Sequence, residues 1–171
     1  MQNAKIAKTK SAPRLLLVGA VLAVFLITWH LSQSGLACEE NYRPDAEIRF
    51  KNQSLMAQIA KSDAELDRGL GGRRCIGDSQ AMLFVFSSLD KHAFWMKDMQ
   101  FPIDIVWLDE SRKIVDFREN VTPDTYPEAF VPLTSAQYVI ELSAGGVKRY
   151  SLGKGDVVDI KNLLSLGAGY H

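Results

Sequence analysis

Polar and apolar residues alternate over much of the chain after residue 45, and this pattern predicts short β-strands. Ala46–Phe50 and Leu55–Ala60 alternate as half-buried strands do, with a turn at 51–54 between them. Continuous apolar runs predict three more strands, at Met82–Phe86, Ala93–Met96 and Ile103–Leu108. After a hairpin turn at 109–112, the remaining strands are expected at 113–118, 138–142 and 157–160.

Helices are expected at only two places. Ser62 and Glu65 form a capping box, which predicts a helix over Asp63–Leu70 that ends at Gly71-Gly72. A second short helix is expected over Ala144–Tyr150, followed by a tight turn. Residues 121–135 contain three prolines and predict a long loop, either functional or a lid. The fold class is therefore β-rich α+β, a small closed or nearly closed β-barrel-like domain with about two short helices.

The N-terminal pattern is different, because it is apolar without alternation. The stretch Leu15–Thr28 has no charge, and all four charged residues before Cys38 are basic and precede it. This order is typical of a secretory signal, with cleavage after Ala37. The uncharged stretch 15–37 is also long enough for an uncleaved membrane anchor, which would be the chain's only membrane contact. Both interpretations place the rest of the chain outside the cytoplasm, in the periplasm or the extracellular space.

The charge balance separates the same two parts. The chain has 171 residues, with 20 basic and 20 acidic side chains, but the first 37 residues hold four bases and no acid. The exported part is therefore mildly acidic, which argues against nucleic-acid binding by bulk electrostatics. We divide the chain into a targeting segment (1–37), a short leader (38–45), a domain (46–161) and a flexible tail (162–171), and we expect a monomer.

Cys38 and Cys75 are the two cysteines, and both lie in the exported part. A disulfide between them would tie the leader to the domain. Two independent thiols are the alternative, because spacing does not set the geometry that a disulfide needs.

Six blocks of sequence resemble the domain-of-unknown-function 192 family in order and spacing. They are RGLGGR (68–73), AMLFVF (81–86), FWMK (94–97), PIDI (102–105), YVIEL with the following AG (138–145) and GKGD (153–156). The resemblance covers about residues 46–161. It implies a compact β-rich domain that is commonly exported in bacteria and archaea, and it implies no established reaction.

Two carboxylates interrupt apolar strands, Asp104 in Ile-Asp-Ile and Glu141 in Val-Ile-Glu-Leu. Because charged residues are almost never buried alone, each is expected to pair with a base such as Arg68, Arg73 or Lys97. We favour such a structural ion-pair network. The alternative is a pair of acids with separated pKa values, as in glycan hydrolases.

Three further side chains are candidates for ligand binding together with the two carboxylates. Arg68 could hold a carboxylate or phosphate of a ligand, or clamp Asp104 or Glu141. Alternation places Phe94 and Met96 on one face and Trp95 and Lys97 on the other, so Trp95 could form a ligand platform.

A metal site finds less support. His92, Met96 and Met99 form a soft-ligand set that could bind Cu(I), although methionine is more often a core filler. We expect no cofactor. The sequence as a whole favours a non-enzymatic, exported module that binds a small ligand or an envelope protein; a glycan-directed envelope hydrolase and a copper-handling protein are the alternatives.

Overall fold

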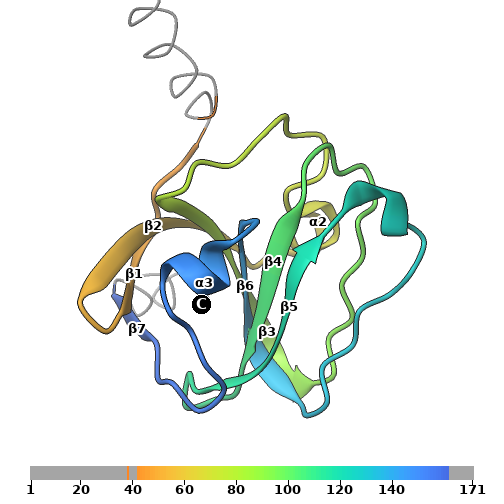
Figure 1. Ribbon diagram of the computed structural model, residues 1–171. Helices are drawn as coiled ribbons and strands as arrows, with labels where there is room; N and C mark the ends of the chain where they lie inside the picture. The colour runs from red at the N-terminus through yellow and green to blue at the C-terminus, as the bar shows by residue number, and fades with distance from the viewer. Residues whose placement is uncertain (1–37, 39–41, 162–171) are drawn as a thin grey trace, which may run out of the picture. The chain divides into compact units, whose positions relative to one another are not determined.

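The computed structural model describes residue 38 and residues 42–161. Seven strands form one mixed sheet in the order β5-β4-β6-β3-β2-β1-β7 (Figure 1). The strands are β1 (Ala46–Phe50), β2 (Gln53–Ala60), β3 (Gln80–Asp90), β4 (Ile103–Leu108), β5 (Ile114–Val121), β6 (Ala136–Ser143) and β7 (Asp159–Lys161). The predicted β-rich α+β class is confirmed.

The sheet is barrel-like without being a closed ladder. An isolated bridge between Lys113 and Val157 joins the segment before β5 to the segment before β7. Backbone bonds extend this contact, since the Ile114 amide donates to Asp156 at 2.8 Å and the Val158 amide donates to Arg112 at 2.9 Å. The two ends of the curved sheet are therefore joined through loop residues.

One pair of strands is parallel, which the sequence pattern did not predict. β2 and β3 run parallel, with Ala57 opposite Ala81, whereas all other pairs are antiparallel. A parallel pair needs a crossover connection. The helix α2 (Asp63–Arg68) lies in that crossover, so its C-terminal end is held beside the middle of the sheet.

The capping box of α2 is present as predicted, with Ser62 at the N-cap and Glu65 bonded back to it. The helix ends at Arg68, two residues earlier than expected, because Gly69 has φ +50 and its amide closes on Glu65. The second helix, α3 (Gly146–Arg149), is shorter than the predicted range and contacts β4 and β6.

The predicted strand at Ala93–Met96 is wrong. These residues make one isolated bridge, in which Phe94 and Phe130 exchange backbone hydrogen bonds of 2.9 and 2.7 Å. Phe94 and Met96 are nevertheless buried and Trp95 is 47% exposed, as alternation predicted. The long proline-rich loop, which contains the 3-10 helix η2 (Pro123–Thr125), is thus pinned to segment 92–99.

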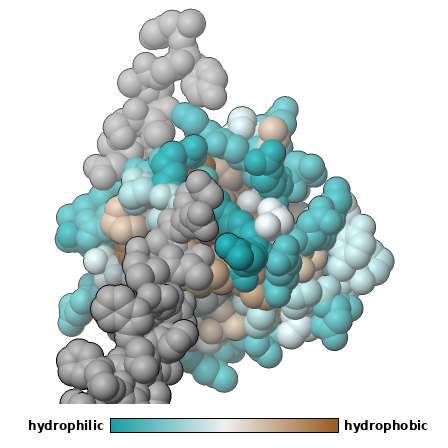
Figure 2. Space-filling view, turned by 90° about the horizontal axis from the view of Figure 1, so that it is seen from above, coloured by the Kyte–Doolittle hydropathy of each residue, from teal (hydrophilic) through white to brown (hydrophobic). Residues whose placement is uncertain are grey.

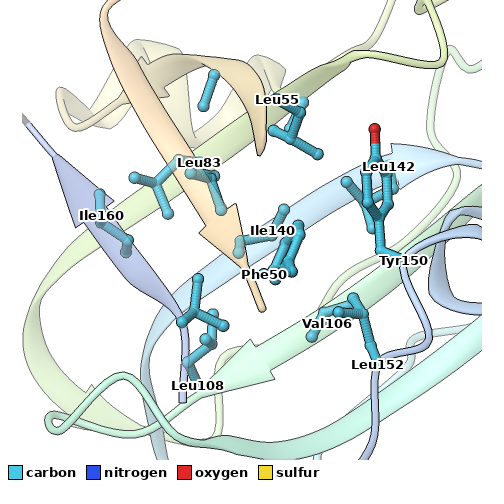
Figure 3. Close-up of a cluster of buried hydrophobic side chains, with 14 of the residues drawn as sticks. Phe50, Leu55, Leu83, Val106, Leu108, Ile140, Leu142, Tyr150, Leu152 and Ile160 are labelled. Atoms are coloured by element: carbon cyan, nitrogen blue, oxygen red, sulfur yellow. The ribbon is translucent and has the colours of Figure 1, made fainter. Parts of the chain in front are cut away.

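Two apolar clusters cover the two faces of the sheet. The inner core fills the curved face and includes Phe50, Leu83, Val106, Ile140 and Tyr150 (Figure 3). The outer core lies on the opposite face, where α2, segment 92–99 and the long loop cover Phe84, Ile105, Trp107 and Val139. Because β4 is covered on both faces, all six of its residues are buried. Polar side chains dominate the face shown in Figure 2, with hydrophobic residues between them.

Among the described residues, no helix is long and apolar enough to cross a membrane. The expected targeting segment (1–37) and tail (162–171) lie outside the described residues.

Candidate functional site

A cavity of about 200 Å³ opens over the outer core. Its floor is formed by Phe84 and Phe86 of β3 and by Glu141 of β6. Residues 66–70, which include the C-terminal end of α2, form one wall, and segment 92–99 forms another. The cavity thus lies where the crossover between β2 and β3 meets the segment pinned by Phe94.

Glu141 is the buried polar group of this cavity. Its side chain points to the outer face because its cross-strand partner Ile105 belongs to the outer core. The residue is 4% exposed, and its Oε2 atom has no hydrogen-bond partner among the described residues. Burial raises the pKa of Glu141 to about 8, against the opposing effects of the Arg73 charge and the Leu70 amide. At neutral pH, the side chain is therefore a carboxylic acid that can donate a hydrogen bond.

Gly69 keeps the cavity open above this carboxyl group. A Cβ atom at Gly69 would lie 3.0 Å from Phe84 Cζ and 3.6 Å from Glu141 Oε2. The positive φ that ends α2 also disfavours any residue with a side chain. The same glycine therefore ends the helix and lets its backbone lie close to Phe84 and the Glu141 carboxyl group.

Aromatic rings line the same cavity as Glu141. Phe94 packs edge-on against Phe84, with centroids 4.8 Å apart, and the His92 ring stacks on Phe86 at 3.5 Å. Trp95 stands at the rim against Tyr126 of the long loop, with centroids 6.2 Å apart. Such walls suit a flat or apolar ligand body.

Two basic side chains line the same cavity without a carboxylate partner. Arg68 and Lys97 are both exposed, and within the described part of the chain neither forms an ion pair; the Lys97 ammonium lies 5.9 Å from the Trp95 ring centroid. Arg68 therefore does not clamp either buried acid, contrary to the preferred expectation. Arg73, which is partly buried, donates to Gln58 at 2.6 Å and acts on Glu141 only through its charge.

Asp104 lies on the opposite face of the sheet and plays a structural part. It is fully buried and accepts hydrogen bonds from the backbone amides of Asn120 (2.7 Å), Gly145 (3.2 Å) and Val147 (2.8 Å). The prediction that Asp104 pairs with a basic side chain is wrong, because backbone amides donate the hydrogen bonds to its carboxylate. Asp104 thereby ties β5 and the start of α3 to β4.

The expected acid pair of a hydrolase is not formed. Asp104 is paired in register with Leu142 of the inner core, whereas Glu141 is paired with Ile105 of the outer core. Cross-strand partners point to the same face, so the two carboxylates lie on opposite sides of the sheet. They cannot act together on one glycosidic bond.

A third buried acid, Asp116, was missed from the sequence. It has no exposed surface and binds Lys154 at 2.7 Å, Arg118 at 3.2 Å and the Leu133 amide at 3.0 Å. Burial opposes its charge, but the Lys154 contact and these other bonds keep its pKa below the usual range. Alternation with the buried Ile114 is the signal that could have revealed it.

The proposed copper ligands do not share one cavity. His92 and Met99 line it, but Met96 is 1% exposed and packs in the outer core. The His92 Nε2 atom is within hydrogen-bond distance of the Ser88 carbonyl, at 3.0 Å. Within the described residues, no group of three or more His, Cys, Asp or Glu side chains could hold a metal ion.

Cys38 and Cys75 are joined in a disulfide, with Cα atoms 5.4 Å apart. This bond links the leader to the loop between α2 and β3, the same crossover that carries Arg68 and Gly69.

Comparisons with known proteins agree with this architecture. The model of the DUF192 family, described as "Uncharacterized ACR", matches residues 46–160. The UPF0127 protein TK1120 of Thermococcus kodakarensis is 27% identical over 113 residues, which cover 63% of this chain and 68% of that protein.

Two solved structures are similar to the chain. One, from Sinorhizobium meliloti, is described as a candidate transcription regulator and is 26% identical, with a TM-score of 0.63 over 69% of this chain and 93% of that one. The other, a protein of unknown function from Novosphingobium aromaticivorans, shares the fold at 23% identity, with a TM-score of 0.62 over 67% and 82% of the two chains.

Proposed function

The chain belongs to the DUF192 family, and we propose that its domain is an exported binding module, not an enzyme, that holds a small organic ligand in the cavity over Glu141. The observation that carries the proposal is the buried Oε2 atom of Glu141, which has no hydrogen-bond partner among the described residues and belongs to a residue that lines the cavity beside Gly69. Native proteins rarely leave such a group unsatisfied unless it has a use.

Binding is favoured over catalysis by the placement of the acids. Asp104 is held by three backbone amides on the other face of the sheet, so it cannot form a catalytic pair with Glu141. Glycan hydrolysis needs two acids flanking one bond. A ligand site needs a concave pocket in which a few polar groups fix the ligand. This cavity combines aromatic walls with the Glu141 carboxyl group and the basic side chains of Arg68 and Lys97.

Export is supported by two features. The basic residues followed by the uncharged stretch 15–37 are typical of a secretory signal or an anchor. The Cys38–Cys75 disulfide suits an oxidising compartment. Nucleic-acid binding, suggested by the description of the Sinorhizobium relative, is not carried over, because acids outnumber bases after residue 37.

Gly69→Ala tests the proposal. We expect a chemically diverse fragment set to contain ligands of the full-length chain that are lost in Gly69→Ala, because the new methyl group enters the space beside Glu141. The matched control is Gly155→Ala, which has φ +92 and nothing within 4 Å of its Cβ position. It shares the backbone strain without filling the cavity. Fragments that bind both variants equally, or a set with no ligand, would refute the proposal.

A further inference from the structure

The cavity combines a neutral hydrogen-bond donor with a positive rim. Arg68 and Lys97 line it without a carboxylate partner, whereas many other bases of the described domain are paired, including Arg49 with Glu47 and Arg149 with Asp78. Arg68 and Lys97 also line an adjoining, wider hollow. A negatively charged group at this rim would satisfy both.

The charge behind the floor of the cavity, that of Arg73, is positive like the rim. Arg73 acts on Glu141 through its positive charge, and the Leu70 amide also favours the ionised form. The other charged or titratable groups that line the cavity are Asp67 and His92. While Glu141 carries its proton, Asp67 is the only other acid that lines the cavity. It is opposed by two bases in the lining, Arg68 and Lys97, and by Arg73 behind the floor, so a cationic ligand is disfavoured there.

The volume and the aromatic walls of the cavity limit the size and shape of the ligand. A cavity near 200 Å³ is smaller than the usual range for drug-sized ligands, which begins at about 300 Å³. Phe84, Phe86 and Phe94 give it flat apolar surfaces. One ring with short substituents fits these limits.

We propose that the ligand is a single-ring organic carboxylate that carries a second oxygen on the far side of the ring. Its carboxylate lies between Arg68 and Lys97, its ring lies against the phenylalanines, and its second oxygen accepts a hydrogen bond from the Glu141 carboxyl group. The inference rests on the proposed function, because it names the ligand class for the same cavity.

Three probes separate the parts of this proposal. The probe para-acetylbenzoate has both groups, para-isopropylbenzoate keeps the shape without the acceptor oxygen, and para-methylacetophenone keeps the acceptor without the charge. We expect the first to bind the full-length chain about tenfold or more tightly than either of the others, measured by calorimetry or ligand-observed NMR. Equal affinities of the three probes would overturn the ligand class.

Variants test the contacts independently of the probes. Arg68→Gln and Lys97→Gln change exposed side chains, so both variants should fold, and each should weaken para-acetylbenzoate by about three- to tenfold. The control is Lys148→Gln, whose side chain is 82% exposed and lies outside the cavity. Unchanged affinity in both rim variants would refute the anionic end of the ligand.

The pH dependence of ligand affinity tests the hydrogen bond that the Glu141 carboxyl group donates. Affinity for para-acetylbenzoate should fall by up to about tenfold for each pH unit above about 8, because ionised Glu141 can no longer donate. Glu141→Gln keeps an N–H donor and all the other charged groups, so it should bind without this loss. The same fall in the variant would overturn the role of Glu141.

The outcomes also distinguish this inference from the proposed function. If neutral or cationic fragments bind in a Gly69-dependent way and the carboxylate does not, the ligand class is wrong and the binding module stands. If no probe or fragment depends on Gly69, both fail.

Discussion

Replacing Glu141 by glutamine should change how the stability of the domain depends on pH. The pKa of Glu141 is about 8 in the folded protein, against 4.5 for the free group, because burial disfavours the charged form. A folded-state pKa that is raised contributes stability that is complete below the unfolded value and is lost as the pH rises through the folded value. The loss should therefore run from about pH 4.5 to about pH 8.

The magnitude follows from the width of that interval. Each pH unit is worth about 1.4 kcal/mol, so ionisation of Glu141 lowers the free energy of unfolding by about 4 to 5 kcal/mol in total. Glutamine has a similar shape and does not titrate. The variant should match the wild type near pH 4.5 and be more stable by several kcal/mol at pH 8 and above.

Urea denaturation of both proteins between about pH 4.5 and pH 9 measures the difference directly. Taking the difference between the two proteins cancels the titration of groups that they share. Glu110→Gln, which changes an exposed acid, is the control and should follow the wild type. Parallel stability curves for wild type and Glu141→Gln would refute the claim that Glu141 is a buried acid protonated at neutral pH.

Two other predictions concern the frame around the site. Asp104→Asn should lower the free energy of unfolding by about 2–4 kcal/mol, because the asparagine side chain cannot accept hydrogen bonds from all three backbone N–H groups. Thermal melting measures this loss against Asp98→Asn, a control that changes an exposed acid. An Asp104→Asn variant that melts at the same temperature as the control would contradict the structural role of Asp104. Reduction of the Cys38–Cys75 bond, which closes a separation of 37 residues, should cost about 3–4 kcal/mol of stability. An unchanged urea midpoint after dithiothreitol treatment would show that the bond does not constrain the unfolded chain.

Much of the fold could be predicted from the sequence because its signals are local. β1 and β4 begin and end at the predicted residues, and the capping box of α2 forms between side chains three residues apart. The parallel pairing of β2 with β3 could not be predicted, because it depends on how α2 crosses the sheet. The segment at Phe94 has the apolar pattern of a strand, but among the residues that the structure describes it pairs only with Phe130.

Only part of the candidate site could be predicted, because local sequence signals do not show how separate strands are placed. Arg68, Trp95, Lys97 and Glu141 do line one cavity. Alternation predicted which residues of β4 point to the same side as Asp104. The register between β4 and β6 decides whether Glu141 points to that side too. A shift of one residue in that register would reverse the answer, and nothing local in either strand sets it. The close approach of Gly69 to Phe84 and Glu141 likewise arises only when α2 ends against β3 and β6.

A crystal structure of the full-length chain with para-acetylbenzoate would show directly whether the cavity over Glu141 is the ligand site. We expect the ring in the cavity between α2 and segment 92–99, with the ketone oxygen within hydrogen-bond distance of the Glu141 carboxyl group and the carboxylate beside Arg68 and Lys97. A ligand bound elsewhere on the domain, or an empty cavity at high ligand concentration, would contradict it.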